Sequence, residues 1–153
     1  MITISITNRQ KNTPVDRRRM RLAVRAILDD ADIADARVSV AVVDDPTIAA
    51  LHEEFLNDPT PTDVLSFVLE RSAGLLEGEV VASADTARRC AARYGNTPER
   101  ELLLYVIHGA LHLVGYDDAT PQQRAVMRRK EKKYLHERSA SEKQCPPKKL
   151  RPS

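Results

Sequence analysis

Short stretches of alternating or continuous hydrophobic residues predict four β-strands in this chain. They cover residues 2–7, Arg37–Val43, Thr62–Leu69 and Glu79–Ala82. Alternation with a period of two, as in the first stretch, places every second side chain on one face of a sheet. Loops rich in Gly, Pro, Asn and Asp separate the stretches, and Gly74 and Gly78 are expected to mark the loop before the last one.

Between and after these strands, apolar residues recur every three or four positions, which is the period of an α-helix. Each such segment starts with a Ser, Thr or Asp suited to cap a helix, and in four of the five a proline follows at the first helical position. The last segment also matches a capping box. The expected helices run from Thr13 to about Leu28, from Asp45 to about Leu56, from Ser83 or Asp85 to Arg93, from Thr97 to just before Gly115, and from Thr120 to about Glu137.

The order β-α-β-α-β-β-α-α-α predicts an α+β fold. We expect a single domain in which a four-stranded mixed sheet packs against about five helices. The fourth helix contains the aliphatic run Leu102–Ile107 and should be the central, buried one. A chain of 153 residues fits one domain, which we place at residues 1–138. Residues 139–153 are polar, basic and contain prolines, so we expect a disordered basic tail there.

Composition narrows the class of protein. The chain has no run of eighteen apolar residues, and its first residues alternate like a strand instead of forming a signal peptide. Two cysteines, Cys90 and Cys145, are too few for a disulfide framework, so the expected location is the cytoplasm and no thiolate metal site is expected. The other histidines, His52 and His136, are expected to be exposed on helices.

The net charge of +2 makes no case for nucleic acid by itself. Its distribution is more informative, because cations recur every four residues in the first and last helices. Such stripes either dock phosphates or form solvated helix faces. They consist of Arg17, Arg21 and Arg25, with Arg18 beside them, and of Arg124, Arg128 and Lys132.

The segment His108–Asp118 (HGALHLVGYDD) carries the candidate chemistry. Two imidazoles at i and i+4 lie on one face of a helix and can converge on one cation, although a pair of buried core histidines is the alternative. Gly115 can end the helix, and the turn then brings Asp117 and Asp118 back towards both imidazoles. Three protein ligands, His108, His112 and Asp118, leave a coordination position open, as in catalytic zinc sites.

A divalent ion at such a site lowers the pKa of its bound water, so the expected nucleophile is a metal-bound water acting on an ester, amide or phosphodiester. Zinc peptidases usually need the Glu of H-E-x-x-H as a base, and Gly109 stands in that position here. No side-chain base is assigned, and Asp117 or Glu79 are the candidates. Phosphodiester cleavage depends less on such a base.

These motifs resemble those of a known family. Apart from its last residue, His108–Asp118 resembles the signature H-G-x-L-H-L-x-G-Y-D-H of the YbeY family of bacterial metal-dependent endoribonucleases. Thr62–Phe67 (TDVLSF) matches a second family motif, and Gly78–Val80 stands where the family has G-D-I. The resemblance covers about residues 2–137.

The resemblance implies an α+β fold with one divalent metal ion, expected to be zinc, in a cleft between the histidine helix and the sheet. It also implies a cytoplasmic role in maturation of the 3′ end of 16S ribosomal RNA and in ribosome quality control, with single-stranded RNA as substrate. The expected partners are ribosomal RNA, the small ribosomal subunit and assembly factors, with no membrane and no DNA. Four residues are possible cleft residues, namely Asp63, Ser66, Glu79 and Asp117.

The sequence departs from the family pattern at three positions. Asp118 replaces the third histidine ligand, which adds a negative charge and should weaken the metal as a Lewis acid. Leu56 stands where the family has an arginine, and Glu79 replaces an aspartate. We therefore keep two alternatives to the endoribonuclease: a ribosome-assembly or RNA-binding factor with little cleavage activity, and, more weakly, a small metallopeptidase.

Overall fold

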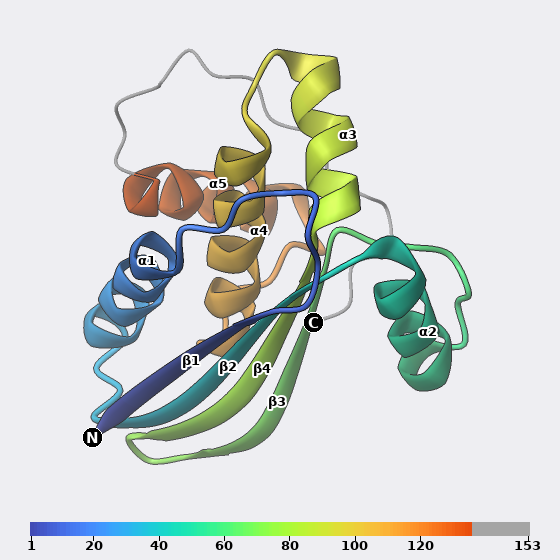
Figure 1. Ribbon diagram of the computed structural model, residues 1–153. Helices are drawn as coiled ribbons and strands as arrows, with labels where there is room; N and C mark the ends of the chain where they lie inside the picture. The colour runs from blue at the N-terminus through green and yellow to red at the C-terminus, as the bar shows by residue number, and fades with distance from the viewer. Residues whose placement is uncertain (136–153) are drawn as a thin grey trace.

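The computed structural model describes residues 1–135, which form a four-stranded mixed sheet and five helices in one domain (Figure 1). The predicted fold class is confirmed, and so is the order of the elements. Residues 136–153 lie outside the described part, so the domain end at 138 and the tail at 139–153 stay predictions. The strands are β1 (Ile2–Asn8), β2 (Asp35–Val43), β3 (Val64–Ser72) and β4 (Leu75–Ser83), and the helices are α1 (Arg17–Asp30), α2 (Asp45–Leu56), α3 (Ala84–Tyr94), α4 (Pro98–Leu113) and α5 (Pro121–Tyr134).

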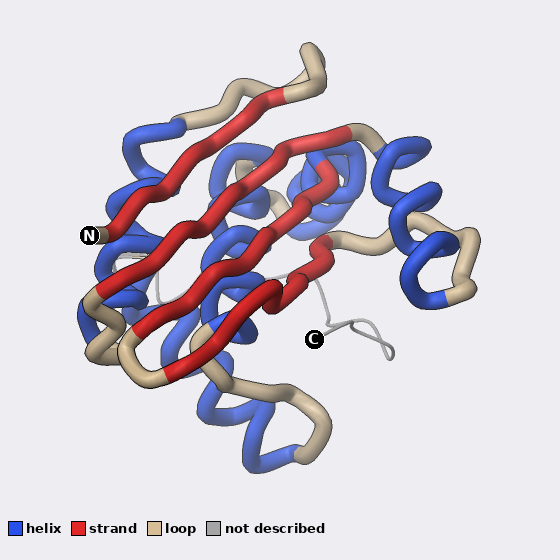
Figure 2. Tube along the Cα trace, turned by 90° about the horizontal axis from the view of Figure 1, so that it is seen from below, coloured by secondary structure: helices blue, strands red, loops and turns tan. Residues whose placement is uncertain are grey.

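The strands are ordered β1-β2-β4-β3 in the sheet (Figure 2). β1, β2 and β4 are parallel, and β3 runs antiparallel to β4 at one edge. The register places Ser66 opposite Val80 and Val64 opposite Ala82. These four side chains therefore point to one face of the sheet, which is the face covered by α4.

Helix α4 is the centre of the molecule, as the sequence predicts. It packs against β3 and β4 and lies beside α1, α3 and α5 (Figure 1). Every residue from Glu101 to Leu113 is buried. Gly78 lies inside β4 and not in a loop, so that prediction was wrong. A Cβ at this position would stand 2.8 Å from Leu113 Cδ2, so glycine permits the close approach of the end of α4.

Helix α2 covers the opposite face of the sheet at one end only. Its Ile48 and Leu51 pack with Leu65 and Val81, which alternate with the residues facing α4. This small second core fixes α2 but leaves the metal motif on the other face. His52 in α2 is buried, with Nδ1 2.8 Å from the Thr60 carbonyl, so the prediction that it is exposed was wrong; His136 lies outside the described residues.

Three of the predicted helix caps are confirmed and two differ. The side chains of Ser83, Thr97 and Thr120 accept hydrogen bonds from the first turns of α3, α4 and α5. α2 is capped by Asp44, one residue earlier than predicted. α1 starts at Arg17 with Asp16 as its cap and not at Thr13, because the Gln10 side chain binds the backbone N–H and C=O of Thr13 and holds it in a turn.

Within residues 1–135, none of the helices is long and apolar enough to cross a membrane.

Candidate metal centre

The third and fourth turns of α4 hold the two histidines. Their spacing of four residues brings the two rings together edge to face, with ring centroids 4.6 Å apart and planes at 72°. The Nε2 atoms of His108 and His112 face each other at 3.0 Å. Both residues are buried, at 5% and 7% exposure. Two imidazoles thus converge on one point beneath the surface.

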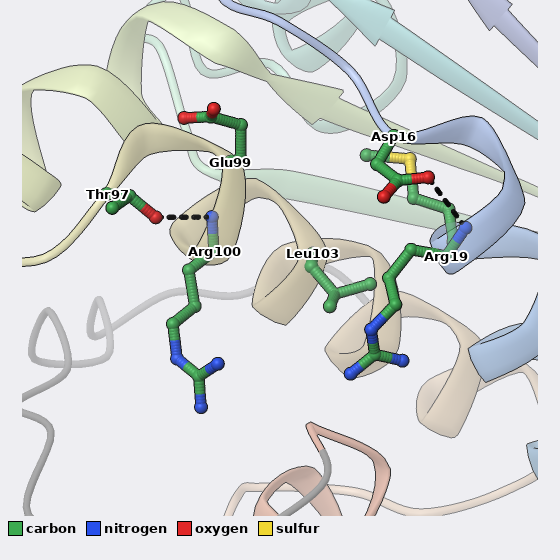
Figure 3. A pocket seen from close by; sticks show the side chains of 7 residues that line it. Asp16, Arg19, Thr97, Glu99, Arg100 and Leu103 are labelled. Atoms are coloured by element: carbon green, nitrogen blue, oxygen red, sulfur yellow. Dashed lines mark hydrogen bonds between the residues drawn. The ribbon is translucent and has the colours of Figure 1, made fainter. Parts of the chain in front are cut away.

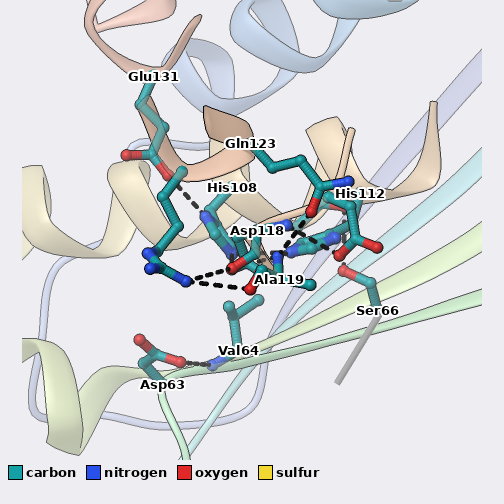
Figure 4. Close-up of polar contacts among 12 residues, drawn as sticks. Asp63, Val64, Ser66, His108, His112, Asp118, Ala119, Gln123 and Glu131 are labelled. Carbon is teal, nitrogen blue, oxygen red and sulfur yellow. Dashed lines mark hydrogen bonds and ion pairs between the residues drawn. The ribbon is translucent and has the colours of Figure 1, made fainter. Parts of the chain in front are cut away.

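The turn after α4 supplies the third polar group. The helix ends at Leu113 with Val114 as its C-cap, and Gly115 takes φ +110, a conformation that favours glycine. The chain then folds back, so that Asp118 Oδ2 lies 3.3 Å from His108 Nε2 and 3.5 Å from His112 Nε2 (Figure 4). The structure therefore brings together the three predicted ligands, which form a possible metal-binding group in the described chain.

The spacing of these donors fits a divalent metal. Donors about 2.0–2.1 Å from a tetrahedral zinc ion are about 3.3–3.4 Å apart from one another. The three observed separations are 3.0, 3.3 and 3.5 Å. A set of two imidazoles and one carboxylate also matches the ligand types of zinc and other divalent transition metals, so the residues present fit a metal ion but do not select its identity.

The electrostatics of the site favour the neutral form of His112. Burial lowers the pKa of His112, and the neighbouring His108 lowers it further, against the raising effect of Asp118 and Asp117. A metal ligand has to be unprotonated to bind, so this shift prepares the ring for coordination. Two unprotonated Nε2 atoms at 3.0 Å also repel each other unless a proton or a cation lies between them.

A fourth residue, Glu131 on α5, was not identified from the sequence. Its Oε2 lies 2.6 Å from His108 Nδ1, and the side chains of the two residues are only 8% and 6% exposed. Because a carboxylate accepts, Nδ1 donates to Glu131, and Nε2 is the ring atom left for a metal ion. This is the carboxylate–histidine arrangement that orients metal ligands in many zinc sites. A signal was present, since Glu131 shares a helix face with Met127 and Tyr134, and an acid on an apolar face needs a partner.

The turn that carries Asp118 is fixed from both sides. Gln123 Oε1 accepts hydrogen bonds from the backbone N–H groups of Ala119 and Thr120, each at 3.0 Å. Arg124 Nη1 donates to the carbonyls of Asp118 and Ala119 at 3.3 and 3.2 Å. On the β3 side, Arg71 Nη2 donates to the Val114 carbonyl at 2.8 Å. The position of Asp118 is therefore set by contacts from α5 and β3.

Gly109 has a packing role. A Cβ at this position would stand 2.6 Å from Val80 Cγ1 and 3.0 Å from Ser66 Oγ. Ser66 Oγ also donates to the Gly109 carbonyl at 3.0 Å, which fastens α4 to β3 (Figure 4). The position after the first histidine thus has no space for a glutamate side chain.

The other predicted site residues lie at different places relative to the two histidines. Asp63 is buried at the start of β3, where its Oδ1 accepts from the Val64 N–H at 2.8 Å. Asp117 is exposed, and its Oδ1 accepts from the Asp118 N–H. Glu79 is exposed on the sheet face opposite α4, across from Phe67, so the structure does not bring it to the histidines. Leu56 is 46% exposed at the end of α2, also beyond the sheet from the site.

A separate cavity lies between the N-terminal ends of α1 and α4 (Figure 3). Two arginines, Arg19 and Arg100, and two acids, Asp16 and Glu99, line it, so its charge favours neither anions nor cations. Asp16 and Thr97 also act there as helix caps. None of the candidate site residues lines this cavity, and we assign it no part in the chemistry.

The fold and the donor set define an α+β protein whose central helix carries a His-His-Asp group suited to a divalent cation. The family described as "Endoribonuclease YbeY" matches residues 5–139, which is most of the chain. The chain therefore belongs to the YbeY endoribonuclease family.

Individual relatives agree with this assignment. A protein from Salinibacter ruber named "Endoribonuclease YbeY" is 35% identical over 87% of this chain and 90% of its own length. Another of the same name from Rhodopirellula baltica is 50% identical, over 61% of this chain and half of the relative. The solution structure of TM1509 from Thermotoga maritima superposes with a TM-score of 0.63 at 30% identity, covering 90% of each chain.

Proposed function

We propose that this protein is a metal-dependent endoribonuclease that hydrolyses phosphodiester bonds in single-stranded RNA, with His108, His112 and Asp118 as metal ligands. The observation that carries the proposal is the convergence of these three donors at 3.0–3.5 Å in a chain of the YbeY family. A divalent ion held there would supply Lewis acidity and activate water near neutral pH. Zinc suits the donor set.

Residues around the three ligands have different roles in this proposal. Glu131 fixes the tautomer of His108, and the contacts of Gln123 and Arg124 fix the turn of Asp118. The rings are buried, so bulk water is largely excluded from the donors. The biological substrate we propose is the 3′ end of 16S ribosomal RNA, processed in the cytoplasm together with the small ribosomal subunit and its assembly factors.

Two observations favour a second candidate, an RNA-binding or ribosome-assembly factor with little cleavage activity. Asp118 adds a negative charge to the metal centre, which lowers the Lewis acidity of a bound ion. Leu56, in place of the family arginine, lies beyond the sheet from the histidines. A metallopeptidase is not supported, because the packing around Gly109 leaves no space for the glutamate base of H-E-x-x-H.

The experiment that tests the proposal is cleavage of a labelled single-stranded RNA by the metal-loaded protein. We expect cleavage that is abolished by a chelator and by His112→Ala, and that resumes when metal is restored to the parent. Ser39→Ala serves as a matched control, since it removes an exposed hydroxyl from β2 and no ligand. If the metal-loaded parent leaves RNA intact while it binds ribosomal subunits, the second candidate replaces the first.

A further inference from the structure

Helix α5 is strongly basic, although the whole chain has a net charge of only +2. It contains three arginines, three lysines and one acid, Glu131. The Glu131 carboxylate is buried against His108, so it does not neutralise the exposed face of the helix. Positive charge is therefore concentrated next to the metal centre.

Three of these cations form a stripe that begins at the metal centre. Arg124, Arg128 and Lys132 are spaced four residues apart, so they lie along one side of α5 over about 12 Å. Arg124 touches the Asp118 turn through its hydrogen bonds to two carbonyls. Arg128 and Lys132 are exposed, and neither forms an ion pair with any residue between 1 and 135.

The stripe faces away from α1. On the other side of α5, Lys133 Nζ pairs with Asp30 of α1 at 3.2 Å, and Lys130 lies over the Tyr116 ring. Met127 and Glu131 form the buried face between the two sides. The stripe therefore runs along the edge of α5 that flanks the Glu131–His108 contact and is not occupied by another helix of the described chain.

The second basic stripe predicted from the sequence lies elsewhere. It belongs to α1, where Arg25 pairs with Asp29 at 3.3 Å and Arg21 Nε donates to the Ile4 carbonyl of β1. Its arginines make no hydrogen bond or ion pair with the 114–119 turn in the described chain. Of the two stripes, only that of α5 adjoins the candidate metal centre.

We propose that Arg124, Arg128 and Lys132 bind the phosphodiester backbone of single-stranded RNA next to the linkage that is cleaved. This inference rests on the proposed function. The carboxylates of Asp117, Asp118 and Glu131 surround the site with negative charge, which repels a polyanion unless cations lie close by. Evenly spaced cations suit a polymer with one charge per repeating unit, and guanidinium and ammonium groups are the usual phosphate donors. The stripe also provides cations on the side of the sheet that carries the histidines. Leu56, in place of the family arginine, provides none there.

The test is equilibrium binding of a fluorescein-labelled single-stranded RNA, with chelator present to prevent cleavage, at salt concentrations from 50 to 200 mM. The variant is R128A/K132A, and the matched control is R17A/R18A, which removes the same charge from exposed positions of α1. Each lost phosphate contact lowers the slope of log affinity against log salt by about 0.7 for single strands. We expect a slope smaller by about 1.4, so the advantage of the parent over the variant shrinks about sevenfold across this range. The control should bind as the parent does.

The outcomes separate this inference from the proposed function. If R128A/K132A binds RNA with the affinity and salt slope of the parent, or if the control loses as much as the variant, the stripe does not bind RNA. A parent that binds no RNA also overturns the inference. A parent that binds RNA through the stripe but cleaves none when loaded with metal supports the stripe and refutes the endoribonuclease.

Discussion

Glu131→Gln should weaken the metal centre without removing a ligand. The Glu131 carboxylate forms a buried, charge-assisted hydrogen bond of 2.6 Å with His108 Nδ1. Loss of such a partner typically lowers metal affinity 10–100-fold, which is about 1.4–2.7 kcal/mol. Gln still accepts a hydrogen bond and keeps the ring orientation, so we expect the lower end of this range. Glu131→Ala removes both charge and bond and should reach the upper end.

The assay is competition for zinc between the protein and a chromophoric chelator, with thermal unfolding of the metal-free proteins as a check on folding. Glu101→Gln is the control, because Glu101 is also a buried acid, on α4, but its hydrogen-bond partners are Asn96 and Tyr105 and not a histidine. It should leave the zinc affinity unchanged. Equal affinities of the parent, Glu131→Gln and Glu131→Ala would refute the role of Glu131.

Three further predictions concern packing, acid stability and metal binding. Gly109→Ala places a Cβ 2.6 Å from Val80 Cγ1 and should cost about 1–3 kcal/mol in urea unfolding, whereas parental stability would contradict the close packing of α4. Burial raises the pKa of Asp45, but hydrogen bonds from Ser83, Arg89 and Thr86 outweigh it, so the pKa is lowered overall. A lowered pKa contributes stability that is present above the unfolded value near 4 and declines as the pH falls through the folded value. Asp45→Asn should therefore cost about 1–3 kcal/mol at pH 7 and less as the pH falls below 4, and a cost that does not change with pH would count against it. A chelator should lower the Tm of the zinc-loaded parent but not that of His108→Ala, and equal shifts would place the metal elsewhere.

Local signals in the sequence were sufficient for much of the fold. Thr97 and Thr120 act as caps in the structure because each side chain bonds to the next turn, which is local in the sequence. Ser83 caps α3 in the same way, and its hydroxyl also donates to Asp45. Thr13 has the same sequence signal but does not cap a helix, because the Gln10 side chain forms hydrogen bonds with its backbone N–H and C=O. His52 is buried for a similar reason, since a loop that follows it supplies the Thr60 carbonyl.

The same distinction between local signals and long-range contacts applies to the candidate site. The spacing of His108 and His112 and the turn at Gly115 are local, and they predict the convergence with Asp118. Glu131 depends on how α5 packs across α4, which spacing alone does not determine. The sequence predicts Glu79 as a possible cleft residue. Its neighbours in the strand, Gly78 and Val80, face α4, and side chains alternate along a strand, so the Glu79 side chain points to the other face of the sheet.

The most direct test of the account is the metal content of the purified protein, measured by elemental analysis for the parent, His112→Ala and Asp118→Ala. Three converging donors predict about one divalent ion per parent chain and a clear loss in both variants. Asn57→Ala, at the end of α2 beyond the sheet, should retain the parental content. If Asp118→Ala holds as much metal as the parent, Asp118 is not a ligand, and if the parent holds none after exposure to zinc, the proposed metal centre is wrong.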